Sequence, residues 1–176
     1  MSGLAPEIFA DHSLSSQRAF ARGVSTVPKQ HRLKDDFIML TPVDMSLHNK
    51  SRRFDIAYED GSSYSFTFEF LRVFSPSADV QGHTPDEAKL QVGKRDVTIV
   101  AAEPVGSYAL RFVFSDGHDS GIYSWEYLAE LGKQQEGLWE AYLEDLKRNG
   151  ASRDPNDPAN TRFADKPKAT CPSHQY

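Results

Sequence analysis

The chain has 176 residues, of which 39% are hydrophobic and 26% charged, a composition typical of one soluble globular domain. Its formal charge of −5 argues against non-specific nucleic-acid binding, which needs a concentrated basic surface. No apolar stretch is long enough to cross a bilayer. The single cysteine, Cys171, excludes an internal disulfide and a cysteine-based metal site, which favours a reducing compartment.

Residues 1–42 show little periodicity, and we expect a leader that is mostly disordered or has a targeting role. From His12 to Lys34 the leader lacks acidic residues and contains several basic ones, as transit peptides do. Glu7 and Asp11, just upstream, do not fit a transit peptide. We therefore expect a cytoplasmic protein if the source is bacterial and a mitochondrial matrix protein if it is eukaryotic.

A first hairpin is predicted near the start of the ordered region. A strand over 43–48 is followed by residues 53–59, in which apolar and polar positions alternate as in a half-buried strand. Asp60-Gly61 favours a tight turn, because glycine tolerates a positive φ and aspartate can accept hydrogen bonds from the turn backbone. Residues 63–66 then form the returning strand.

A second hairpin is predicted further along the chain. Residues 97–105 are apolar and β-branched, which indicates a central strand, and residues 108–115 form the next strand. Asp116-Gly117 repeats the turn signal of the first hairpin. Between the hairpins, residues 75–85 contain two prolines and a glycine without an apolar period, so we expect a loop.

Helices are predicted after each hairpin, where a hydroxyl residue precedes an aromatic-rich segment. Thr67 and Ser124 are typical N-caps, since their side-chain oxygens can accept a hydrogen bond from a free backbone N–H. We expect the helix after Ser124 to end at Gly132. A third helix is predicted over 134–149, where apolar residues recur on one face.

The two hairpin regions share one pattern: strand, Asp-Gly turn, strand, hydroxyl residue, aromatic, Glu, aromatic, Leu. The pattern ends at Thr67–Leu71 in the first copy and at Ser124–Leu128 in the second. It predicts a small α+β domain over 43–150, made of two antiparallel β-hairpin-plus-short-helix units and a C-terminal helix. Residues 151–176, rich in proline and polar residues, are expected to be a disordered tail.

His118 is the first candidate for chemistry, because it lies between Asp116 and Asp119 and could serve as a metal ligand or an acid–base group. The alternative is a turn residue held by these carboxylates, and we favour it because a metal site needs three or four ligands. His83, with Asp79 nearby, would add a second histidine if the fold brought it to His118.

Three parts of the chain are distinctive: residues 70–83, residues 93–97 followed by 103–111, and residues 116–128. Through them the chain resembles the gamma-butyrobetaine hydroxylase-like N-terminal domain family, long regarded as a domain of unknown function, over about residues 44–150. The resemblance implies a small α+β fold. It also implies a domain that occurs alone in bacteria, joined to P-loop iron–sulfur carrier proteins, and at the N-terminus of carnitine-pathway dioxygenases.

In those dioxygenases, the resemblance further implies, the domain binds a structural zinc through three cysteines and a distant histidine. The cysteines fall on Ser75, Ser77 and Val80 of this chain, and the histidine falls on His118. Neutral serine hydroxyls are poor zinc ligands and valine is none. We therefore expect no zinc cofactor, and we expect loop hydrogen bonds and packing to hold this region together.

We expect an accessory or interaction module that is not an enzyme. Dioxygenase chemistry needs a 2-His-1-carboxylate iron site, which in these enzymes lies on a separate barrel domain. The family fusions suggest an iron–sulfur carrier or client protein as partner, bound around the 75–85 loop, His118 and Trp125. Two alternatives stay open: an accessory subunit of a larger assembly, and a weak metal- or small-ligand-binding domain. The second would use His83, His118, Asp79, Asp116 and Asp119.

Overall fold

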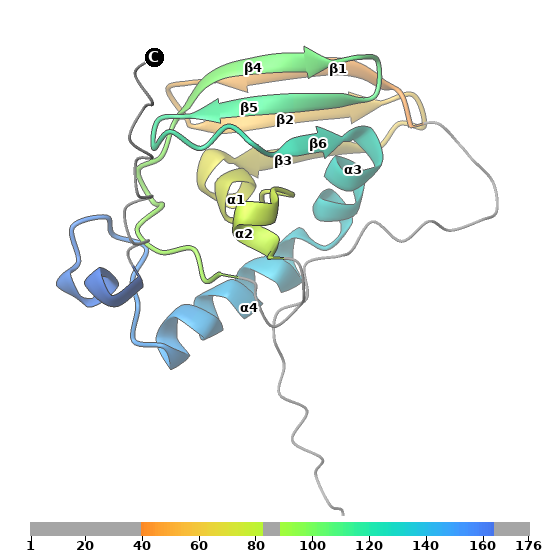
Figure 1. Cartoon of the computed structure of the whole chain (residues 1–176). Helices are drawn as coiled ribbons and strands as arrows, with labels where there is room; N and C mark the ends of the chain where they lie inside the picture. Colours follow the sequence, from red (N-terminus) through yellow and green to blue (C-terminus); the bar gives the residue numbers. More distant parts are fainter. Residues whose placement is uncertain (1–39, 83–88, 164–176) are drawn as a thin grey trace, which may run out of the picture.

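The structure is a computed structural model that describes residues 40–82 and 89–163. Two three-stranded antiparallel sheets, β1-β2-β3 and β4-β5-β6, lie one in front of the other, and the helices lie along one side of the pair (Figure 1). No helix in the described ranges is long and apolar enough to cross a membrane.

Each sheet is followed by helices in the chain. The first sheet comprises β1 (Pro42–His48), β2 (Arg53–Tyr58) and β3 (Ser63–Thr67), and α1 (Phe68–Val73) and α2 (Ala78–Gln81) follow it. The second comprises β4 (Ile99–Val105), β5 (Ala109–Phe114) and β6 (Ile122–Ser124). Then come α3 (Trp125–Lys133), α4 (Gln135–Arg148) and a 3-10 helix, η2 (Pro158–Phe163).

The predicted α+β fold of two hairpin-plus-helix units is confirmed. Gly61 and Gly117 occupy matching turns with φ of +84° and +81°, a conformation that glycine adopts without strain. The Thr67 side chain accepts a hydrogen bond from a first-turn N–H of α1, and Ser124 does the same for α3. Even the first strands match, since β1 and β4 each carry a register irregularity at their second residue.

The core lies between the two sheets and against the helices. β2 and β5 each turn alternating apolar side chains toward the other sheet, and the rings of Phe54 and Phe112 meet at 5.1 Å in an edge-to-face contact. Burying one such side chain stabilises the fold by about 1.5–3 kcal/mol. The buried set comprises Phe54, Ile56 and Tyr58 on β2, and Leu110, Phe112 and Phe114 on β5.

Buried tyrosines connect the two units. Tyr58 of the first unit donates its hydroxyl hydrogen to the carbonyl oxygen of Trp125, at the start of α3, over 2.9 Å. Tyr123 of the second unit donates to the carbonyl oxygen of Leu71, in α1, over 2.7 Å. Burial raises the pKa of both phenols, which therefore stay neutral donors at physiological pH.

Three local predictions differ from the structure. Residues 99–105 form the edge strand β4, paired only with β5 among the described residues, and not a central strand. Its proline, Pro104, lacks an N–H and is tolerated at an edge. The predicted loop contains the one-turn helix α2, because the Ser77 side chain caps it. The helix expected to end at Gly132 continues to Lys133.

Residues 151–163, which the sequence assigns to the tail, pack on the body of the domain. The N–H of Gly93 donates to the carbonyl oxygen of Ser152 over 2.9 Å. The Arg153 guanidinium makes a bidentate ion pair with Glu69, whose side chain is 7% exposed, and also lies 4.9 Å from the centre of the Trp139 ring. These contacts extend the folded part of the chain to Phe163.

Candidate functional site

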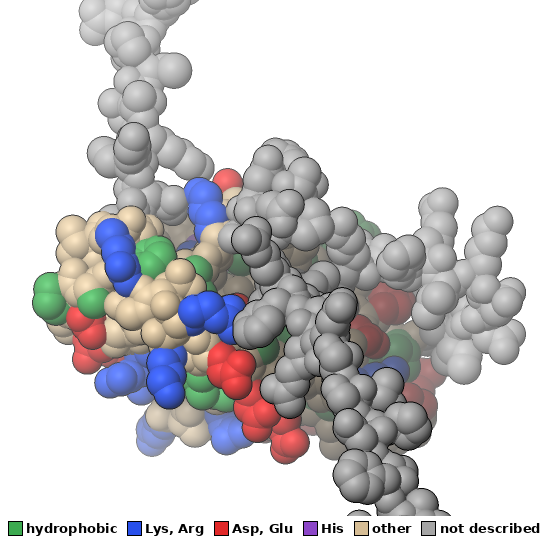
Figure 2. Space-filling view, turned by 90° about the horizontal axis from the view of Figure 1, so that it is seen from below, with side chains coloured by type: hydrophobic (Ala, Val, Ile, Leu, Met, Phe, Trp, Pro, Cys, Tyr) green, Lys and Arg blue, Asp and Glu red, His purple; other side chains and the backbone are tan. Residues whose placement is uncertain are grey.

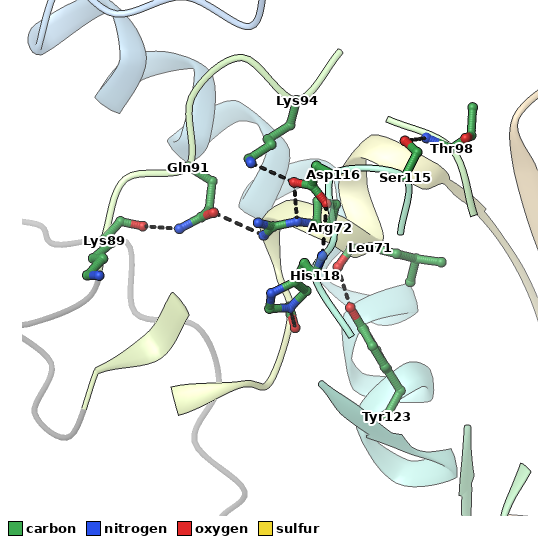
Figure 3. Close-up of polar contacts among 11 residues, drawn as sticks. Leu71, Arg72, Lys89, Gln91, Lys94, Thr98, Ser115, Asp116, His118 and Tyr123 are labelled. Atoms are coloured by element: carbon green, nitrogen blue, oxygen red, sulfur yellow. Dashed lines mark hydrogen bonds and ion pairs between the residues drawn. The ribbon is translucent and has the colours of Figure 1, made fainter. Parts of the chain in front are cut away.

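The predicted site around His118 lies in a group of polar side chains that we call the polar cluster. Its members come from three places: the end of α1, the segment between α2 and β4, and the turn between β5 and β6 (Figure 3). The polar cluster consists of Arg72, Ser75, Gln91, Lys94, Asp116 and His118.

Asp116 is the centre of the charged half of the polar cluster. Its Oδ2 accepts a hydrogen bond from Arg72 Nε over 2.9 Å and another from Lys94 Nζ over 2.6 Å. The Arg72 side chain is only 8% exposed, and its Nη1 donates to Gln91 Oε1 over 3.0 Å. A guanidinium this deeply buried needs a counter-charge, and Asp116 supplies it.

The charge of Asp116 is fixed by the same contacts. Burial alone would raise the pKa of Asp116, but the hydrogen bond from Lys94 and the positive charges of Arg72 and Lys94 outweigh burial and hold the pKa below its usual value. Asp116 is therefore ionised throughout the physiological pH range. It also accepts a hydrogen bond from the backbone N–H of His118 over 3.4 Å, within its own turn.

Ser75 and His118 form the other half of the polar cluster. Ser75 is fully buried, and its Oγ lies 2.8 Å from Nε2 of the half-buried His118 ring. Gly121 makes this contact possible, because a Cβ at that position would overlap the Ser75 hydroxyl. The serine therefore fits between the histidine and a backbone that approaches closely.

His118 is held in its neutral form. Burial lowers the pKa of His118, the Arg72 guanidinium lowers it further, and the nearby carboxylates of Asp116 and Asp79 compensate only in part. A neutral imidazole can either accept from or donate to the serine hydroxyl through Nε2. His118 is thus a turn residue attached to Asp116, as the sequence favoured, and also a hydrogen-bond partner of Ser75.

Of the four positions on which the resemblance places zinc ligands, those of Ser75 and His118 are in contact, but the four side chains do not fit zinc. Ser75 bonds to His118, and Ser77 caps α2 by accepting from the N–H of Asp79 over 3.2 Å. Val80 is buried as an apolar side chain. Within the described ranges, no three His, Cys, Asp or Glu side chains are grouped as a metal site would require. The contacts observed in this region are hydrogen bonds and apolar packing.

The remaining predicted site residues have different surroundings. Asp79 and Asp119 are exposed, and Asp79 Oδ2 accepts a hydrogen bond from Ser120 Oγ over 3.3 Å. Trp125 is only 8% exposed, and its Nε1 donates to the carbonyl oxygen of Ser107, so it contributes little surface to a partner. His83 lies outside the described residues.

Sequence reasoning missed four residues of the site. Arg72 carried a signal, because a lone arginine inside the apolar run 70–74 must find a counter-charge when it is buried. Gln91 and Gly121 carried no local signal. Lys94 follows Gly93, which has a φ of +67°, and its reach to Asp116 depends on the tertiary fold.

Comparisons with known proteins agree with the resemblance read from the sequence. The model of the family described as gamma-butyrobetaine hydroxylase-like, N-terminal, matches residues 45–129. Two proteins with NMR solution structures are similar to this chain. The first is 47% identical, with 68% of this chain and 94% of the other covered and a TM-score of 0.59. The second is 41% identical, with 70% and 92% covered and a TM-score of 0.60.

A crystal structure from Acidithiobacillus ferrooxidans is also similar. Its protein has unknown function and belongs to the DUF971 family. It is 37% identical, with 52% of this chain and 92% of that chain covered and a TM-score of 0.43. Among curated proteins no match is found.

Proposed function

The chain belongs to the gamma-butyrobetaine hydroxylase-like, N-terminal, family, and we propose that it acts as a non-catalytic module that binds another protein. The proposed partner is an iron–sulfur carrier or one of its client proteins. That choice of partner class is supported by the fusion to P-loop iron–sulfur carriers that the family resemblance implies.

One observation carries the proposal: the groups of the polar cluster are committed to one another. Asp116 is bonded to Arg72 and Lys94, and Ser75 to His118, at distances of 2.6 to 2.9 Å. Groups paired in this way join three separate parts of the chain. This arrangement suits a surface held in a fixed shape better than it suits a reacting centre.

The surface beside the polar cluster carries two exposed carboxylates. Asp79 lies on α2, and Asp119 lies in the β5–β6 turn, next to His118. The hydrogen bond from Ser120 to Asp79 links the turn that carries Asp119 to the helix that carries Asp79. We call this pair the acidic surface. Its charge would be recognised by lysine or arginine side chains of the partner.

Other parts of the surface are less distinctive. Seen from below, the described side chains of both charges are interspersed, without a large area of one sign (Figure 2). The acidic surface also differs from the predicted partner site in one respect, because Trp125 is buried and does not belong to it.

The test is affinity purification of the tagged full-length chain from its native cells, under anaerobic conditions, with identification of co-purifying proteins. The informative variant reverses both charges of the acidic surface, Asp79→Lys with Asp119→Lys. The matched control, Glu140→Lys with Glu144→Lys, makes the same change in net charge at exposed positions of α4.

We expect iron–sulfur carriers or clients with the wild type and the control, and their loss with the acidic-surface variant. A single large assembly in fixed stoichiometry would instead identify an accessory subunit. A bound metal or small molecule without a protein partner would support a ligand-binding domain.

A further inference from the structure

β1 is an edge strand with an apolar, exposed side. It pairs with β2 alone among the described residues, so one row of its N–H and C=O groups has no strand beside it. Val43 is 61% exposed, Met45 is 43% exposed and Leu47 is 36% exposed. β1 is also seven residues long, so it is not protected by being short. Natural proteins usually protect such an edge, because it can pair with another chain.

The other edge strands are protected. β4 contains Pro104, which cannot donate a hydrogen bond to an added strand. β3 and β6 continue directly into α1 and α3, and the helices lie on that side of the sheets (Figure 1). β1 has a proline only at its first residue, Pro42, and the stretch from Asp44 to His48 that would pair contains no proline, lysine or glycine.

The apolar side chains of β1 lie on the core face of the sheet. Met45 is directly opposite Ile56, and Leu47 is directly opposite Phe54, both of which are buried between the sheets. Residues directly opposite each other share a face of an antiparallel sheet. Met45 and Leu47 therefore extend the core face up to an edge that no strand of residues 40–82 and 89–163 covers.

We propose that two copies of this chain associate by pairing their β1 strands in antiparallel register about a two-fold axis at Ser46. In this register Met45 of one copy faces Leu47 of the second copy, so apolar side chains meet. Asp44 faces His48 of the second copy. His48 Nε2 lies 3.0 Å from Asp55 Oδ2 within its own copy, which leaves Nδ1 of the ring to donate a hydrogen bond to the Asp44 carboxylate when the ring is protonated. The strand is thus self-complementary, as a two-fold interface requires.

The two-fold symmetry also explains how the exposed apolar side chains of β1 would be covered. A two-fold axis between antiparallel strands is perpendicular to the sheet, so the second sheet of both copies lies on the same side of the joined first sheets. The β4 edges of the two copies then face each other across the axis. Met45 and Leu47 of both copies become enclosed between the continuous sheet and these two edges, which removes apolar surface from water.

The first test measures the mass of the full chain in solution by light scattering and sedimentation over a range of concentrations. We expect a dimer that dissociates on dilution. Met45→Lys should give a monomer, because it places a charge in the enclosed space. Leu143→Lys is the matched control, since Leu143 is 37% exposed and lies on α4, away from β1 and β4 (Figure 1).

The second test reads the register directly by cysteine cross-linking in a Cys171→Ser background. Ser46→Cys places two thiols opposite each other on the axis, within the range that a disulfide spans. His48→Cys is the control, because residue 48 faces residue 44 of the second copy. We expect rapid oxidative cross-linking of the first variant and little of the second.

Three results would overturn the proposal: a monomer at every concentration, a dimer that survives Met45→Lys, or cross-linking through residue 48 in preference to residue 46. Neither test uses the acidic surface, so this proposal can fail while the proposed function stands, and the reverse also holds.

Discussion

Removal of the Asp116 carboxylate should weaken the fold more than any other single change in the polar cluster. Asp116→Ala would leave the Arg72 guanidinium, 8% exposed, with only Gln91 as a hydrogen-bond partner. Lys94 Nζ, now 2.6 Å from Asp116, would add a second positive charge without a counter-ion. Breaking a buried pair from one side costs about 3–5 kcal/mol.

The lower end of that range applies here, because the Asp116 side chain is 26% exposed and water can reach part of the site. We therefore expect a loss of about 3 kcal/mol in the free energy of unfolding. That is a large fraction of the roughly 5–15 kcal/mol that stabilises an ordinary domain. Urea titration followed by the fluorescence of Trp125 and Trp139 would measure it.

Two comparisons make this prediction specific. Asp119→Ala removes an exposed carboxylate from the same turn and should change the free energy of unfolding by at most about 0.5 kcal/mol. Arg72→Met combined with Asp116→Leu removes both charges and should be less destabilising than Asp116→Ala alone. Equal losses for Asp116→Ala and Asp119→Ala would refute the role of Asp116 as the counter-charge.

Further predictions concern glycines and the histidine. Gly121→Ala should lower the melting temperature, because its methyl group would overlap the buried Ser75 hydroxyl. Gly137→Ala should raise the melting temperature, because the added methyl group meets open space and alanine favours the helix α4. Equal effects of the two variants would contradict the close contact at Gly121. Gly61→Val and Gly117→Val should each cost about 1–3 kcal/mol in a urea titration because φ is positive there, and unchanged stability would exclude the turn conformation. Folding lowers the pKa of His118, mainly through burial. The contribution of the neutral imidazole to the free energy of unfolding is therefore complete above the unfolded pKa of about 6.5, and it is lost as the pH falls through the folded pKa. His118→Gln should therefore flatten the decline of stability with acidification below pH ~6.5, and an unchanged slope would disprove this origin.

The hairpins and helix starts could be predicted from the sequence because their causes are local. An Asp-Gly pair at a turn and a hydroxyl residue before a helix act within a few residues, and Gly61 and Thr67 behave as the pattern predicts. The edge position of β4 could not be predicted in this way. A β-branched run looks alike at the centre and the edge of a sheet, and only Pro104 hinted at the edge.

Long-range contacts account for what the sequence did not reveal about the site. Arg72 and Asp116 are 44 residues apart, and Glu69 and Arg153 are 84 residues apart. No local pattern connects such residues, so the polar cluster and the packing of residues 151–163 follow only from the tertiary fold. The position of His118 in its turn was predicted from the sequence, but its contact with Ser75 was not.

The central claim is that hydrogen bonds in the polar cluster hold together the region where the family resemblance implies a structural zinc in the dioxygenases. The most direct test compares the melting temperature of the purified full-length chain before and after treatment with a strong chelator, together with metal analysis of the same sample. We predict a folded, metal-free protein whose melting temperature does not change. Stoichiometric zinc whose removal lowers the melting temperature would contradict the account.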